Sequence, residues 1–84
     1  MLIIKKIDDN IREGHMKTIK EIREEHGFSQ EQFAKMLGCS RRTYQDKERG
    51  ILPFSMHDVI IASQLNHGCV RIHVDDGDYD IKVR

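Results

Sequence analysis

The spacing of apolar residues along the chain changes near residues 10–15 and again near residues 66–68, which divides it into three segments. Residues 1–9 are rich in isoleucine and run into an Asp-Asp-Asn breaker, so their β propensity predicts a short strand. The middle segment has the three-and-four spacing of half-buried helices. The last segment alternates between apolar and polar residues, which is typical of β-strands.

The middle segment predicts a first helix with apolar residues on one side. It would begin at Ile11 or Met16 and continue to His26, because Gly27 is a natural stop for a helix. Asn10 is a candidate N-terminal cap for the longer version.

Three serines predict the start of three further helices. The hydroxyls of Ser29, Ser40 and Ser55 can accept a hydrogen bond from the backbone N–H three residues later. Gln32 and Asp58 stand three residues after Ser29 and Ser55, which is the spacing of a capping box. Four short helices joined by tight turns are therefore expected.

The last segment predicts a β-hairpin, for which placing Asp76 and Gly77 at the centre of a type I′ turn sets the register. All apolar residues then share one face: Val74 lies opposite Tyr79, Ile72 opposite Ile81 and Val70 opposite Val83, while His73 meets Asp80 on the other face. A two-stranded ribbon is marginally stable alone. The apolar face must therefore cover the helices, pair with the N-terminal strand, or contact another subunit.

Length and composition narrow the class of protein. A chain of 84 residues is the size of one small domain, residues 1–84. Its 14 basic and 14 acidic residues balance, so overall charge does not identify a partner. The longest uncharged apolar run has four residues, far below a membrane span, which predicts a cytoplasmic protein. Cys39 and Cys69 form no CxxC pair, so reduced thiols are expected.

The stretch from Phe28 to Gly50 resembles the helix-turn-helix of the phage-repressor-like regulators of the XRE or Cro/C1 family. Ala34 is a small residue where two helices would cross, Gly38 permits a left-handed turn, and Tyr44 takes the apolar position that locks the second helix onto the first. The resemblance covers residues 19–65. It implies a mainly helical fold, a compact bundle of four to five short helices over residues 11–65, with the hairpin at 68–84 as a dimerisation element.

The resemblance also implies a function, in which the helix at residues 41–49 enters the major groove of DNA. Arg41 and Arg42 would be the main readers, since a guanidinium matches the two acceptors of guanine. Gln45 and Asp46, one turn further, would be the next base contacts. Asp46 departs from the family pattern, and three roles are open: accepting from cytosine, orienting Arg42, or repelling phosphate.

Other residues implied by the resemblance position the DNA or the recognition helix. Arg23 and Glu48 would form a partly buried ion pair between the first helix and the recognition helix. The positions expected to touch phosphates are Ser29, Gln30, Ser40, Thr43 and Arg49. For Ser29 and Ser40, helix capping is an equally good explanation, and both roles can hold together.

Sequence patterns for other kinds of site are weaker than the helix-turn-helix pattern. His67, Cys69 and His73 share one side of a strand and cannot close a tetrahedral metal site alone, and the acidic turn lacks the spacing of a calcium loop. No catalytic or cofactor-binding motif occurs, so neither an enzyme nor a cofactor is expected.

The leading hypothesis is a dimeric, sequence-specific DNA-binding repressor of a phage or mobile element that reads a palindromic operator. The hairpin residues expected at the dimer interface are Val70, Ile72, Val74, Tyr79, Ile81 and Val83. The alternatives are an antitoxin that binds a toxin and autoregulates, and a protein-binding adaptor without DNA binding.

Overall fold

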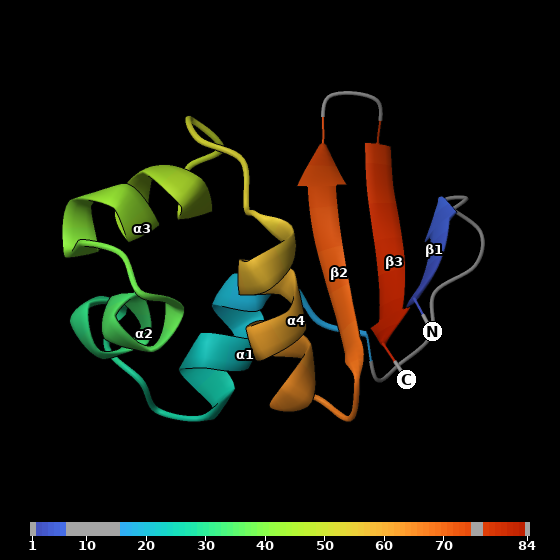
Figure 1. The fold of residues 1–84 in the computed structure, drawn as a ribbon, viewed down its shortest axis with the longest axis horizontal. Coiled ribbons are helices and arrows are strands. Elements are labelled where there is room, and N and C mark those ends of the chain that lie inside the picture. Colours follow the sequence, from blue (N-terminus) through green and yellow to red (C-terminus); the bar gives the residue numbers. More distant parts are fainter. Residues whose placement is uncertain (1, 7–15, 75–76, 84) are drawn as a thin grey trace.

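The computed structural model describes residues 2–6, 16–74 and 77–83. These residues form the strand β1 (Leu2–Lys6), the helices α1 (Ile19–Glu25), α2 (Gln30–Leu37), α3 (Arg41–Glu48) and α4 (Met56–Gln64), and the strands β2 (Cys69–Val74) and β3 (Gly77–Val83). The helices gather on one side of an antiparallel sheet, with α2 and α3 farthest from it (Figure 1). This arrangement confirms the expected fold class, with the predicted hairpin and N-terminal strand both present.

The first helix begins later than predicted. Thr18 is its N-terminal cap, and Thr18 and Glu21 form a capping box that the sequence pattern Thr-x-x-Glu could have indicated. The residue before the cap is hydrogen-bonded to the sheet instead. The carbonyl of Lys17 accepts a hydrogen bond of 2.8 Å from the N–H of Arg71 in β2. Met16 is therefore buried outside the helix, and a start at Met16 is wrong. The alternative start at Ile11, like its cap, falls outside the described residues.

The other three helices begin at the predicted caps. The hydroxyls of Ser29, Ser40 and Ser55 accept hydrogen bonds from the backbone N–H three residues on, and Ser29 and Ser55 complete capping boxes. Gly38 ends α2 at a φ of 79°, a left-handed conformation in which a side chain would be strained. The turn between α2 and α3 is therefore short and fixed.

The hairpin pairs in a register two residues away from the predicted one. Val70 faces Ile81, Ile72 faces Tyr79, Arg71 faces Asp80 and His73 faces Asp78. The predicted register would have placed Arg71 opposite Lys82, and two like charges directly opposite each other are unfavourable. In the observed register Arg71 donates two hydrogen bonds to Asp80, of 2.7 and 3.1 Å. A shift of two residues keeps every side chain on its face, so the apolar face remains as predicted.

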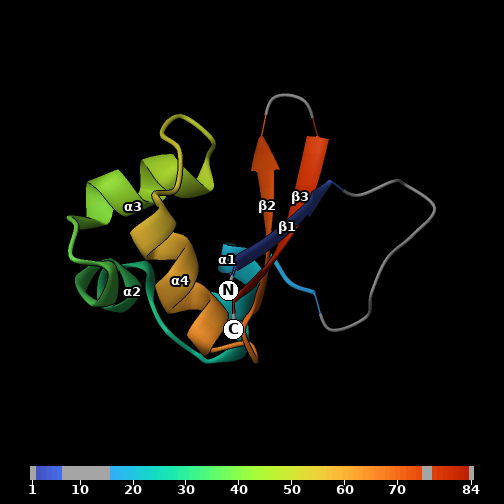
Figure 2. The same ribbon diagram turned by 45° about the vertical axis from the view of Figure 1, so that its right-hand side comes forward.

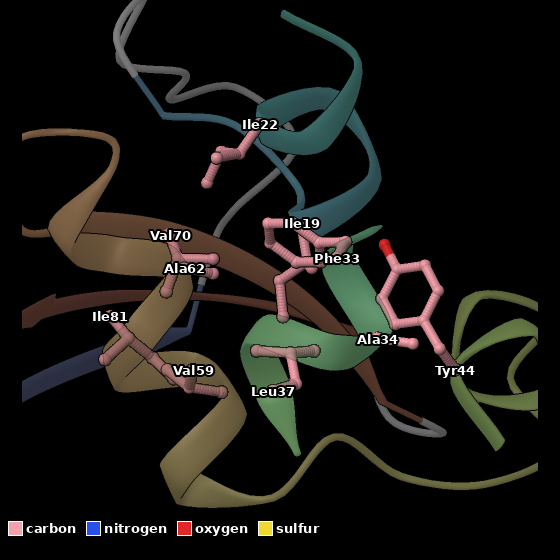
Figure 3. Close-up of a cluster of buried hydrophobic side chains, with 10 residues drawn as sticks. All are labelled: Ile19, Ile22, Phe33, Ala34, Leu37, Tyr44, Val59, Ala62, Val70 and Ile81. Carbon is pink, nitrogen blue, oxygen red and sulfur yellow. The ribbon is translucent and has the colours of Figure 1, made fainter. Parts of the chain in front are cut away.

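The apolar face of the sheet is covered from within the chain. Val70 and Ile81 are fully buried and join the core side chains of all four helices (Figure 3). The edge of the hairpin pairs with β1, which gives the strand order β1-β3-β2 (Figure 2). The hairpin is therefore stabilised both by covering the helices and by pairing with the N-terminal strand, which are two of the three predicted alternatives.

Val70 and Ile81 were also expected at a dimer interface, and this part of the prediction is corrected. Both side chains are at most 1% exposed, because they fill the chain's own core. A partner subunit could not reach them. Within the described part of the chain, no helix is long and apolar enough to cross a membrane.

Candidate nucleic-acid interface

Helices α2 and α3 form one rigid unit. Tyr44 on α3 is completely buried, and its ring meets that of Phe33 on α2 edge to face, with ring centroids 5.5 Å apart. Ala34 lies beside them, as the close-up of the core shows (Figure 3). Aromatic pairs in this geometry contribute about 0.5–1.5 kcal/mol beyond the area they bury. One face of α3 is thus fixed against α2, and the opposite face is directed to solvent.

The solvent face of α3 carries unpaired positive charge. Arg41 and Arg42 lie in its first turn and Arg49 follows its last residue, and all three side chains are exposed. Among the described residues none of the three guanidinium groups makes an ion pair or a side-chain hydrogen bond. The same holds for the half-buried carboxylate of Asp46, so Asp46 does not orient Arg42 here.

Glu48 is the centre of a hydrogen-bond network that holds α3 from behind. It accepts a bond of 2.9 Å from Nε of Arg23 on α1, one of 3.0 Å from Nε2 of Gln30 on α2, and one from the hydroxyl of Tyr44. Arg23 also donates to the carbonyl of Phe28. The ion pair implied by the resemblance is therefore formed, with side-chain exposures of 11% for Arg23 and 7% for Glu48.

The environment of Glu48 favours its charged form. Burial alone would raise the pKa of this carboxyl group, but the hydrogen bonds from Tyr44, Gln30 and Arg23 together lower it below its ordinary value. Burial also raises the pKa of Tyr44 far above its usual range, and the hydrogen bond to Glu48 adds to this effect. The tyrosine stays neutral and the glutamate stays ionised throughout the physiological pH range.

The network continues to a predicted base contact. Nε2 of Gln45 on α3 donates a hydrogen bond of 2.9 Å to Oε1 of Gln30. Gln30, which was expected to contact phosphate, thus connects Glu48 to Gln45. The side chain of Gln45 is oriented before any ligand arrives. Sequence reasoning placed both glutamines at the interface and missed the bond between them.

The hydroxyls expected at phosphates act as helix caps. Ser29 accepts from the N–H of Gln32 at 3.0 Å, and Ser40 accepts from the N–H of Thr43 at 3.1 Å. Ser40 also donates to the hydroxyl oxygen of Thr43 at 3.0 Å. The capping interpretation of Ser29 and Ser40 is therefore realised, and both serines lie exposed at the N-terminal ends of α2 and α3.

A second ion pair, which the sequence did not indicate, joins the C-terminal end of α3 to α4. Nζ of Lys47 lies 2.5 Å from Oδ2 of Asp58 on α4, and Asp58 is almost completely buried. The same Asp58 oxygen accepts from the N–H of Ser55, completing the capping box. Burial raises the pKa of Asp58, but the bonds from Lys47 and Ser55 outweigh it and lower the pKa. The capping pattern predicted the local role of Asp58, whereas its partner on α3 depends on the tertiary fold.

These pairings decide the charge of the exposed surface. Residues 41–49 contain four basic and two acidic side chains, but Lys47 and Glu48 are neutralised by partners within the chain. Three exposed arginines then stand against the single carboxylate of Asp46. The solvent face of α3 is therefore positive although the whole chain is neutral, which suits a polyanionic partner.

Comparison with known protein families agrees with this geometry. The helix-turn-helix family model matches residues 19–65, more than half of the chain, and these residues include α1 to α4. No curated protein and no solved structure matches the chain. On the family match and the arrangement of α2 and α3, the chain belongs to the Cro/C1-type helix-turn-helix family of DNA-binding regulators.

Proposed function

We propose that the protein is a sequence-specific transcriptional repressor that reads the major groove with α3. The observation that carries this proposal is the exposure of Arg41 and Arg42, without partners among the described residues, on the first turn of a helix fixed from behind by Tyr44 and Glu48. A helix held in this way presents its first turn to base edges without further rearrangement. Arginine is the side chain that most often reads guanine there.

The remaining polar groups would position the DNA. Gln45, oriented by Gln30, and Asp46 would meet base edges one turn further along α3. The backbone contacts would come from Ser29, Gln30, Ser40, Thr43 and Arg49. Contacts to phosphate fix the register of the protein on the duplex and carry no base preference.

We also expect the protein to act as a dimer on two half-sites about 34 Å apart. With Val70 and Ile81 buried, the interface is better sought at β1, which lies at an edge of the sheet and exposes Ile3 and Ile4. Sedimentation should show a dimer that Ile4→Asp dissociates. Ile51→Asp, at a more exposed position in the loop after α3, should leave the dimer intact. A parent protein that remains monomeric at high micromolar concentration, with and without DNA, would contradict this assembly.

Base reading can be separated from backbone positioning on the same helix. A random duplex library first yields the preferred operator, and binding is then measured on all single-base variants. Arg42→Ala should weaken binding to the preferred operator by about 1–3 kcal/mol and flatten the preference at one position. Arg49→Ala should weaken cognate and random DNA alike.

Arg41→Ala belongs in the same series, because Arg41 and Arg42 point about 100° apart on the helix and either can be the principal reader. Lys35→Ala, on α2 outside the predicted interface, is the matched control for loss of one exposed charge. If neither Arg41→Ala nor Arg42→Ala changes the pattern of base preference, α3 does not read the bases in the way proposed.

A further inference from the structure

A pocket opens between the reading helix and the sheet. Its volume is about 460 Å³, and its walls are the start of α1, the end of α3, the loop that follows α3, and β2. We propose that this pocket binds a small organic anion with an apolar body, held by Lys20 and Arg49.

Part of the pocket lining is apolar. It consists of side chains from α1, the loop after α3 and β2, namely Ile19, Leu52, Pro53, Phe54 and Ile72. Ile19 is almost completely buried, whereas Leu52 is 39% exposed and so offers apolar surface to a ligand. Ligand sites commonly have volumes of 300–1,000 Å³ and combine apolar walls with a few polar groups. The pocket fits this description for a ligand of one or two fused rings.

Three of the charged groups in the wall already have partners. Lys47 is paired with Asp58, Glu48 with Arg23, and Arg71 with Asp80. Each of these three groups is neutralised by an oppositely charged residue of the chain, so none of them adds net charge to the pocket wall.

Lys20 and Arg49 also line the pocket, and neither has an ion-pair partner in the described part of the chain. The uncompensated charge is therefore positive, which selects an anion. Arg49 can hold a carboxylate or sulfonate with two parallel hydrogen bonds.

Three carbonyls near the end of α3 already have hydrogen-bond donors. The carbonyls of Gln45, Asp46 and Lys47 accept hydrogen bonds of 2.9–3.2 Å from the N–H groups of residues 49–52. These carbonyls have the donors they need from the turn itself. Among the described residues that line the pocket, Lys20 and Arg49 are therefore the charged groups left to bind a ligand.

Occupation of the pocket would affect DNA binding through Arg49. This consequence rests on the proposed function, in which Arg49 contacts a phosphate. A ligand that pairs with Arg49 would remove that contact, so the anion and DNA would compete for one guanidinium group. The pocket would thereby serve as an effector site next to the reading helix.

The binding test uses the fluorescent anion 8-anilinonaphthalene-1-sulfonate and contains no DNA. We expect saturable binding of one probe per chain, and roughly tenfold weaker binding in the double variant Lys20→Gln/Arg49→Gln, from about threefold for each exposed charge pair. Leu52→Glu, which places a negative charge in this apolar part of the lining, should also weaken binding. N-phenyl-1-naphthylamine, a neutral probe with a similar ring system, should bind more weakly than the sulfonate and should be insensitive to the double variant.

Lys35→Gln is the matched control, because it removes an exposed lysine on α2 away from the pocket. Circular dichroism and thermal melting establish that each variant is folded. Equal affinity of the sulfonate for the parent and the double variant, or absence of saturation up to millimolar probe, would overturn the proposal.

A second measurement follows DNA binding at saturating probe, where the affinity of the parent for random duplex DNA should fall. If the probe binds as described and the protein binds no DNA at all, the pocket stands and the proposed function fails. If DNA binds and the probe does not, the proposed function stands and the pocket proposal fails.

Discussion

Replacing Glu48 with alanine should destabilise the fold by about 3 kcal/mol. Its carboxylate is 7% exposed and accepts hydrogen bonds from Arg23, Gln30 and Tyr44. Removing one partner of a buried ion pair costs about 3–5 kcal/mol, because the other charge is left uncompensated. Arg23 keeps its bond to the carbonyl of Phe28 and is 11% exposed to water, so the lower end of this range applies.

Urea denaturation followed by circular dichroism measures this loss directly. In a domain of this size 1 kcal/mol shifts the melting temperature by about 4–8 °C, so a fall of roughly 12–24 °C is expected. The double variant Arg23→Met/Glu48→Leu removes both charges and should recover much of the lost stability, since replacing a buried pair by apolar groups is often neutral or favourable. At a temperature where Glu48→Ala is folded, it should bind all DNA sequences more weakly by the same factor. A loss below about 0.5 kcal/mol would show that both groups are solvated and contribute little to stability.

Three further predictions concern caps, acid stability and the sheet. Ser40→Ala should lower the free energy of unfolding by about 1 kcal/mol and Ser40→Gly by only a few tenths in urea denaturation, because the hydroxyl caps α3; equal losses would contradict the capping role. The pKa of Asp58 is lower in the folded than in the unfolded chain, so its contribution is present at neutral pH and disappears as the pH falls below about 4. Asp58→Asn should therefore show a smaller drop in melting temperature between pH 7 and pH 3 than the parent, and an unchanged drop would contradict this. Asp80→Ala should cost about 2 kcal/mol in urea by breaking the pair with Arg71. Asp78→Ala, whose histidine partner is 80% exposed, should cost under about 0.5 kcal/mol, and similar costs for the two variants would refute the difference.

Local chemistry predicted the local structure well. The caps at Ser29, Ser40 and Ser55 were identified because a capping hydroxyl bonds a backbone group only three residues away. The start of α1 was predicted too early because apolar spacing alone extended it, while the capping box at Thr18 was overlooked and the bridge from Lys17 to β2 depends on the tertiary fold. Elements whose ends are decided by neighbouring residues were thus more predictable than those decided by distant ones.

The predicted register of the hairpin was wrong, and the sequence itself contains the information that would correct it. A type I′ turn at Asp76 and Gly77 predicts one register, whereas the charges that face each other across the strands favour another. The pairing of Arg71 with Asp80 instead of Lys82 would have corrected it. By contrast, the bonds of Gln30 to both Glu48 and Gln45, and of Lys47 to Asp58, join separate helices and required the assembled structure. The family resemblance was enough to name the residues of the candidate site. It could not show which of them are already held by hydrogen bonds or ion pairs within the chain.

The pairing of β1 with β3 has a consequence for the order of folding. Leu2 lies opposite Val83, so this ladder closes a loop that contains nearly the whole chain, whereas the hairpin and the helix-turn-helix form through contacts between residues near in sequence. Closing a long loop carries a larger entropic cost and slows the formation of the contacts that depend on it. The helices and the β2–β3 hairpin are therefore expected to form first, with the outer edge of β3 open until β1 arrives. During that interval the open edge can accept a strand from another molecule, so dilute conditions should favour correct refolding.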